Sequence, residues 1–235
     1  MRELTLTPRL AAVAALVPQG ARLADIGTDH AYLPIHLIQT GRILSAIACD
    51  LREGPLARGR AAAQDWGVNG ISFRCCDGLA GLAPDEADSV VIAGMGGETI
   101  IKILEDVSWS KREGLHVLLQ PMSGVPELRQ WLIAAGYRIA REVLVREDAR
   151  FYLIFSVFSG EDAPYTPAEL EAGRQWRSMD APLRADYLAD LIRRRRRALM
   201  GMSQGAAVPA AQLEATAALL TALEAMKEEW TAWQR

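Results

Sequence analysis

The sequence predicts an α/β protein with a mostly parallel sheet, an antiparallel hairpin at the end of that sheet, and a helical hairpin after it. Three observations support this prediction. Short apolar runs alternate with helix-forming segments from residue 22 to about residue 136. Two strand-like segments then follow with only Asp148 and Ala149 between them. From residue 161 onward, helix formers dominate and apolar side chains recur at steps of three and four.

Composition narrows the class of protein. The chain has 235 residues, half of them hydrophobic, and a net charge of −3, so it can bury a full core and has no global positive field. Its cysteines, Cys49, Cys75 and Cys76, form no CxxC pair, which favours a reducing compartment and a cytoplasmic protein. With only three histidines, we expect no metal site. Thr7 and Pro8 predict the start of a short N-terminal helix, and neither a signal peptide nor a membrane span is expected.

The alternating region is typical of a doubly wound sheet. Its strands are short and rich in Val, Ile and Leu without polar alternation, as expected for parallel strands buried on both faces. The predicted strands are 22–26, 45–50, 71–75, 89–94 and 115–120, and the predicted helices are 32–41, 54–67, 98–107 and 125–136.

The last two predicted strands, 137–147 and 150–158, are too close in sequence for a crossover connection, so they form an antiparallel hairpin. Plain dinucleotide-binding folds usually keep a parallel sixth strand. A Rossmann-like sheet that ends in such a hairpin resembles the class I methyltransferases, which bind S-adenosylmethionine (SAM).

A second domain follows, so we expect boundaries of 1–160 and 161–235. Residues 160–167 predict a linker, 201–209 a loop, and the segments 183–200 and 210–233 two helices that pair as a hairpin. The first helix carries an apolar stripe of Leu183, Tyr187, Leu188, Leu191 and Ile192. The second carries Leu213, Ala217, Leu220, Leu223, Met226, Trp230 and Trp233.

Acids and glycines collect at the ends of four predicted strands, where open α/β sheets bind ligands. These residues are Asp25 and Gly27, then Asp50, then Asp77 and Gly78, then Gly94, Gly96 and Gly97. A nucleoside ligand accounts for this pattern, because Asp50 can accept both ribose hydroxyls and Asp77 can accept from an adenine amino group. An acidic rim repels a pyrophosphate but tolerates a sulfonium cation, which favours SAM over NAD.

Each acid also has an ordinary structural alternative. Asp25 could cap the following helix, Asp50 could be a loop acid, and Asp77 with Gly78 is a common turn pair. The ligand-binding interpretation therefore depends on three acids at successive strand ends.

Several longer strings resemble one family. "LADIGTDHAYLPIHLI", "CDLREGPLARGRA", "VVIAGMGGETI" and "REDARFYLI" occur in the order and spacing of the bacterial tRNA (adenine(22)-N1)-methyltransferases, the TrmK family. The resemblance covers about residues 2–158 and implies a SAM-dependent domain, a coiled-coil-like C-terminal domain and tRNA as partner. It implies that Asp25, Gly27, Asp29 and His30 line the SAM pocket and catalytic centre. Asp50 and Asp77 would hold the ribose and adenine.

By the same resemblance, Gly94, Met95, Gly96 and Gly97 form the floor under the target base, with Gly94 and Met95 also binding the cofactor and Gly96 and Gly97 the substrate. Gln120 and Pro121 in "LQPM" would contact the substrate; the next residue is Met122, where the family more often has asparagine.

The string "AGMGG" bears on the reaction. Enzymes that methylate exocyclic amines usually carry an Asn/Asp-Pro-Pro-aromatic string at this place, and its acceptors are absent here. Ring nitrogen N1 of adenine has an in-plane lone pair and needs alignment only. We expect the Asp29 carboxylate to stabilise the developing positive charge and His30 and Tyr32 to position the base.

The run "RRRRR" at residues 193–197 continues the first C-terminal helix. Arg195 falls on its apolar face, whereas Arg193, Arg194, Arg196 and Arg197 are candidates for phosphate contacts. The alternative is a solvated helix end that the helix dipole favours. Arg146 and Arg150, beside the strand hairpin turn, could extend a basic patch.

Other functions remain open from the residues alone. They are a SAM-dependent methyltransferase for a small molecule, a non-catalytic RNA-binding protein with this fold, and a nicotinamide oxidoreductase, which the missing phosphate-binding glycines disfavour. The sequence leaves the oligomeric state open, with a monomer among the options.

Overall fold

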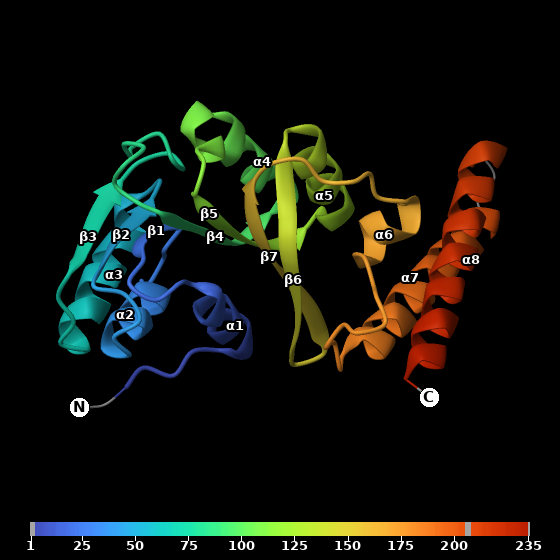
Figure 1. Ribbon diagram of the computed structural model, residues 1–235, viewed down its shortest axis with the longest axis horizontal. Coiled ribbons are helices and arrows are strands. Elements are labelled where there is room, and N and C mark those ends of the chain that lie inside the picture. The colour runs from blue at the N-terminus through green and yellow to red at the C-terminus, as the bar shows by residue number, and fades with distance from the viewer. Residues whose placement is uncertain (1–2, 205–207, 235) are drawn as a thin grey trace. The chain divides into compact units, whose positions relative to one another are not determined.

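The structure is a computed structural model that describes residues 3–204 and 208–234 (Figure 1). The chain divides into two compact units, one up to Ala163 and one from Pro164 onward.

The first unit contains a seven-stranded mixed sheet in the order β3-β2-β1-β4-β5-β7-β6. Strands β1 to β5 are parallel, and β7 lies antiparallel between β5 and β6. The strands are β1 (Arg22–Ile26), β2 (Ser45–Asp50), β3 (Ile71–Cys75), β4 (Ser89–Gly96), β5 (His116–Ser123), β6 (Tyr137–Glu147) and β7 (Arg150–Ser159). The predicted fold, a parallel sheet with a terminal antiparallel hairpin, is confirmed.

Helices cover both faces of this sheet (Figure 1). One face carries α1 (Pro8–Leu16), α2 (Tyr32–Gln39) and α3 (Glu53–Asp65); the other carries α4 (Gly97–Glu105) and α5 (Val125–Ala134), with the short 3₁₀ helix η1 (Ser108–Lys111) after α4. Strand β4 runs two residues past the predicted end at Gly94. Strand β5 also runs past its predicted end at Gln120, so β4 has a partner there. The bulged pairs Met95–Pro121 and Gly96–Ser123 extend the ladder between the two strands.

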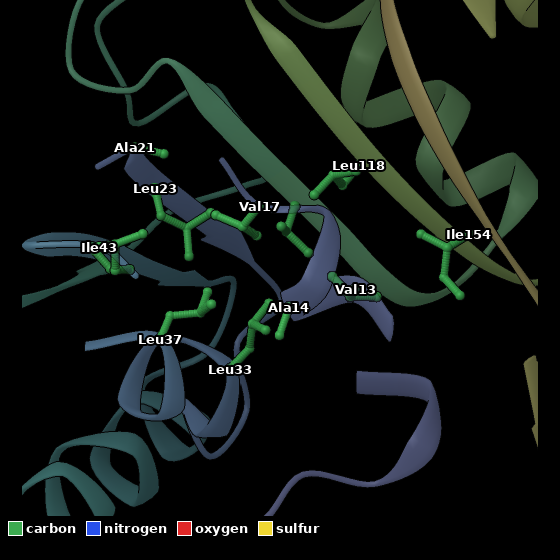
Figure 2. Packing of buried hydrophobic residues seen from close by; sticks show 12 residues of the cluster. Val13, Ala14, Val17, Ala21, Leu23, Leu33, Leu37, Ile43, Leu118 and Ile154 are labelled. Carbon is green, nitrogen blue, oxygen red and sulfur yellow. The ribbon is translucent and has the colours of Figure 1, made fainter. Parts of the chain in front are cut away.

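One hydrophobic core cluster of this unit forms where α1 packs on the sheet. Figure 2 shows Val13 and Ala14 of α1, and Val17 directly after this helix, among side chains from the sheet and from α2. Leu23 of β1 and Leu118 of β5 belong to the same cluster, and all five side chains are at most 5% exposed. Burying one such aliphatic side chain contributes about 1.5–3 kcal/mol. The N-terminal helix, which carries Arg9, is therefore an integral part of the fold.

The second unit contains α6 (Pro167–Ala172), α7 (Arg184–Gln204) and α8 (Ala210–Trp233), and α7 packs along α8. Part of each predicted apolar stripe is buried, namely Tyr187, Leu188, Leu191 and Ile192 of α7 and Leu223 and Trp230 of α8. The other stripe residues, Leu183, Leu213, Ala217, Leu220, Met226 and Trp233, are half-buried.

Two predictions for this unit need correction. Residues 201–204, expected in a loop, are the last turn of α7, whose helix formers continue through them; residues 205–207 of that expected loop lie outside the described residues. Helix α6 occupies a stretch for which no helix was expected. Its capping box, Thr166 with Glu169, is a recognisable sequence signal.

The buried Arg184 at the start of α7 links this helix to α6. Its guanidinium donates to the carbonyls of Ala172 and Gly173 at the end of α6.

Candidate active site

The turn after β1 is held in an unusual backbone conformation. Gly27 has φ +74, and its N–H donates to the Cys49 carbonyl of β2 at 2.8 Å. Asp29 and Ala31 have φ +46 and +54, in the left-handed region that non-glycine residues rarely adopt. This turn therefore aims the polar residues between β1 and α2 at the carboxyl edge of the sheet.

Asp25 lies beneath this turn and is 6% exposed. The Thr28 hydroxyl donates to its carboxylate at 2.6 Å. Burial raises the pKa of Asp25 to about 6, and the Thr28 hydrogen bond opposes that rise. The N-cap of α2 is Ala31 and has no side-chain cap, so Asp25 does not cap this helix.

A pocket of about 800 Å³ opens at the carboxyl ends of β1, β2 and β4. Four acids and two bases line it: Asp50, Asp77, Glu98 and Asp106 against Arg52 and Lys102. The other lining residues are Ile26, Gly27, Leu51, Cys76, Gly78, Met95, Thr99 and Ile103. The excess of carboxylates favours a cationic ligand over a pyrophosphate.

The loop that carries Asp77 is fixed from behind by an ion pair. Arg74 contacts both carboxylate oxygens of Glu86 at 2.8 Å and donates to the Gly81 carbonyl at 2.6 Å. Glu86 in turn accepts from the Ala83 N–H at 2.7 Å. The Arg74 hydrogen bonds lower the pKa of Glu86 to about 2. Asp77 is therefore presented on a loop whose ends are tied together.

A second, smaller pocket of about 310 Å³ lies beside the first, and Gly27 lines both. Its other lining residues are Arg9, Leu10, Asp25, Thr28, Asp29, His30, Tyr32, Leu33, Ala93 and Gly94. A Cβ built on Gly27 would lie 2.2 Å from the methyl carbon of Met95, so only glycine fits between the pockets without movement.

Asp29 is held from two sides in the smaller pocket. Its Oδ1 accepts from Arg58 of α3 at 2.5 Å, and its Oδ2 lies 3.7 Å from Nε2 of His30. The His30 ring stacks on Tyr32 with centroids 5.1 Å apart. The three residues expected to act on the target base, Asp29, His30 and Tyr32, thus lie in one pocket.

In "LQPM", Gln120 and Pro121 are buried, deeper than a substrate contact requires, whereas Met122 is exposed. Gln120 is fully buried; its Oε1 accepts from the Gly94 N–H at 3.1 Å and from Arg9 at 2.6 Å. Its Nε2 donates to the Pro121 carbonyl at 2.9 Å. These bonds occupy the amide, so Gln120 fixes its neighbours.

Among the residues that the structure describes, Gly96 and Gly97 line neither of the two pockets. A Cβ on Gly97 would lie 2.5 Å from the Gly124 carbonyl, so Gly97 allows α4 to approach the turn after β5.

The arginine run on α7 is largely paired with acids. Arg193 and Arg194 pair with Asp190, Arg195 with Glu171, and Arg196 with Glu224 at 2.5 Å. Within residues 3–204 and 208–234, Arg197 forms no ion pair. Arg193, Arg196 and Arg197 line a groove between α7 and α8 of about 850 Å³, together with Lys227.

The strand hairpin presents two further arginines. Arg146 lies over the Phe151 ring at 5.9 Å, and Arg150 pairs in register with Glu147. Both are exposed.

The part of the chain that the structure describes offers neither a metal site nor a membrane span. No group of three or more His, Cys, Asp or Glu residues there could hold a metal ion. None of the helices formed by those residues is long and apolar enough to cross a membrane.

Comparisons with known proteins agree with this geometry. A family model for a methyltransferase domain matches residues 6–155. The tRNA (adenine(22)-N(1))-methyltransferase of Bacillus subtilis is 38% identical over 175 residues, which cover 74% of each chain. The crystal structure of the B. subtilis TrmK aligns with a TM-score of 0.77 at 29% identity, covering 98% of this chain and 99% of that one. Sp1610 of Streptococcus pneumoniae in complex with S-adenosyl-L-methionine aligns with a TM-score of 0.82 at 29% identity, covering 95% and 100%. This chain therefore belongs to the class I methyltransferases and, within them, to the family of the tRNA (adenine(22)-N(1))-methyltransferases.

Proposed function

We propose that this protein transfers the methyl group of SAM to N1 of adenosine 22 in tRNA, the activity named for its B. subtilis relative. One observation carries the proposal: the carboxylate-lined pocket and the smaller pocket meet at Gly27. A cofactor in the first and a base in the second would bring donor and acceptor together there.

The larger pocket has the chemistry to hold SAM. Asp50 ends β2, where its carboxylate can accept the ribose hydroxyls, and Asp77 can accept from the adenine amino group. Bound SAM would supply an electrophilic methyl group on a sulfonium. Gly27 and Gly94, with φ +74 and +78, keep side chains out of the junction at which that methyl group must be exposed.

On the base side, the protein has to align a lone pair and stabilise a positive charge. N1 of adenine needs no prior deprotonation, and methylation leaves the ring cationic. Asp29 can accept from the adenine amino group and offset that charge, while Arg58 and His30 hold the carboxylate in place. His30 and Tyr32 provide a stacked pair against which the base can be positioned. The absence of amine-directed acceptors in "AGMGG" supports N1 over the exocyclic amine.

The unit from Pro164 onward supports recognition of the rest of the tRNA in this proposal. Displacing a base from a folded RNA costs a few kcal/mol. Phosphate contacts from Arg193, Arg194, Arg196 and Arg197, with Arg146 and Arg150, would offset that cost, and phosphates would compete with the acids that now pair with the run. We further propose that the protein acts in the cytoplasm.

The direct test is transfer of labelled methyl groups from SAM to unmodified bacterial tRNA, followed by identification of the product nucleoside by mass and retention. The proposal requires 1-methyladenosine. A product of N6-methyladenosine contradicts the assignment to N1. Binding of SAM with no transfer to any tRNA contradicts the assignment of the substrate and returns the small-molecule alternative.

A further inference from the structure

Arg9 of α1 enters the smaller pocket from a part of the chain far from the strand-end motifs. It lines this pocket together with Asp25, Asp29 and His30. Among the described residues that line it, Arg9 alone carries a permanent positive charge. Its Nη1 lies 3.9 Å from the position that a Cβ on Gly94 would occupy, so the guanidinium lies close to the end of β4.

The Arg9 residue is held in place by three contacts. Nη1 donates to Oε1 of the fully buried Gln120 at 2.6 Å. The Arg9 carbon Cζ lies 5.6 Å from the centroid of the Tyr152 ring. The Arg9 backbone N–H donates to Glu147 at 2.9 Å, and this bond lowers the pKa of the Glu147 carboxyl. A long side chain thus held loses little further entropy when it binds a ligand.

Most of the hydrogen-bonding capacity of this cation remains available. A guanidinium has five N–H donors. Among the described residues, only Gln120 accepts a hydrogen bond from the Arg9 side chain. Asp25 and Asp29 line the same pocket, yet neither forms an ion pair with Arg9 among the described residues. The site thus combines carboxylates with a fixed cation that has donors to spare.

We infer that Arg9 binds a phosphate next to the target adenosine. This inference rests on the proposed function, because it needs a nucleotide displaced into the smaller pocket. The displaced nucleotide brings its phosphate toward Asp25 and Asp29, which repel it, and Arg9 offsets that repulsion. An arginine also fits a phosphate better than a base, since its forked donors match phosphate oxygens in a bidentate contact. Gln120 is then a positioning residue that orients Arg9.

The test asks whether removing the Arg9 charge and removing one phosphate charge affect kcat/KM through the same contact. Wild type and Arg9→Gln are assayed on tRNA assembled from synthetic pieces, with natural phosphates or with one neutral methylphosphonate on either side of adenosine 22. For wild type, one of the two methylphosphonates should lower kcat/KM about 10- to 100-fold, the range for a charge-assisted hydrogen bond. Arg9→Gln should show that loss on natural tRNA and little further loss on that methylphosphonate.

Arg22→Gln is the matched control. It removes the same charge at the other end of β1, where Arg22 pairs with Asp88 at the surface, and should behave as wild type on every RNA. The affinity for SAM, measured by calorimetry, should be equal in all three proteins.

Different failures have different meanings. If wild type transfers no methyl group to natural tRNA, the proposed function fails and the inference fails with it. If wild type is active, and the methylphosphonates lower kcat/KM by the same factor in wild type and in Arg9→Gln, the phosphate contact is refuted while the function stands. If Arg9→Gln loses SAM affinity, Arg9 supports the cofactor pocket instead, which overturns the inference. If 7-deazaadenosine at the target, rather than the methylphosphonate, cancels the effect of Arg9→Gln, the residue contacts the base and the inference is wrong.

Discussion

Replacing Asp25 with asparagine should stabilise the cofactor-free protein at pH 8 and have little effect at pH 4. Burial raises the pKa of Asp25 from its ordinary value of 3.8 to about 6 in the folded protein. Folding therefore disfavours the ionised carboxylate, and the destabilisation grows as the pH rises from about 4 to about 6 and then stays constant. Asparagine has no charge to bury, and it can still accept the hydrogen bond from Thr28.

The size of the effect follows from the same values. A rise from 3.8 to about 6 corresponds to about 3 kcal/mol above pH 6, at 1.36 kcal/mol per pH unit. This is an upper limit, because the asparagine amide also has to be desolvated. For a unit of this size, 3 kcal/mol raises the melting temperature by about 6–12 °C.

Thermal unfolding of both proteins from pH 4 to pH 8, without SAM, measures this difference. The gap between Asp25→Asn and wild type should open through pH 5–6. Asp65→Asn, an exposed change at the end of α3, should produce no such pH-dependent gap. A constant gap across the range, or a less stable Asp25→Asn protein at pH 8, would show that Asp25 is not a buried and destabilising acid.

Three further predictions concern the site. Asp29→Ala should lose turnover while its SAM affinity by calorimetry is unchanged, and full activity would contradict its assigned role. Gly27→Ala should weaken SAM binding at least about tenfold, through backbone strain and the close approach of the new Cβ to Met95. Gly41→Ala, with a similar φ and no neighbour within 4 Å, should bind SAM normally. Equal SAM affinities of the two variants would contradict the close approach. Replacing the exposed α7 residues Arg194, Arg196 and Arg197 by glutamine should flatten the salt dependence of tRNA binding by roughly one unit of slope for each arginine that binds a phosphate. An unchanged slope would rule out this binding.

The larger pocket was the most predictable part of this protein. Parallel strands bring their carboxyl ends to one edge, so Asp50 and Asp77 could be assigned to a common pocket without coordinates. The short spacing between Glu147 and Arg150 was likewise enough to predict the hairpin, because no crossover fits there.

Features that depend on long-range contacts could not be predicted. Arg9 reaches the smaller pocket only because α1 packs across the sheet, and Gln120, 111 residues later, holds it there. The acids that pair with the arginine run include Glu171 and Glu224, which come from other helices. The left-handed conformation of Asp29 has no sequence signal comparable to a glycine.

The assigned target is tested most directly by methyl transfer from SAM to two transcripts of one bacterial tRNA, identical except that one carries guanosine in place of adenosine 22. We expect 1-methyladenosine in the first transcript, mapped to position 22, and no methylated nucleoside in the second. Equal methylation of both transcripts would contradict the assigned target, and methylation of neither, by a protein that binds SAM, would contradict the assigned substrate.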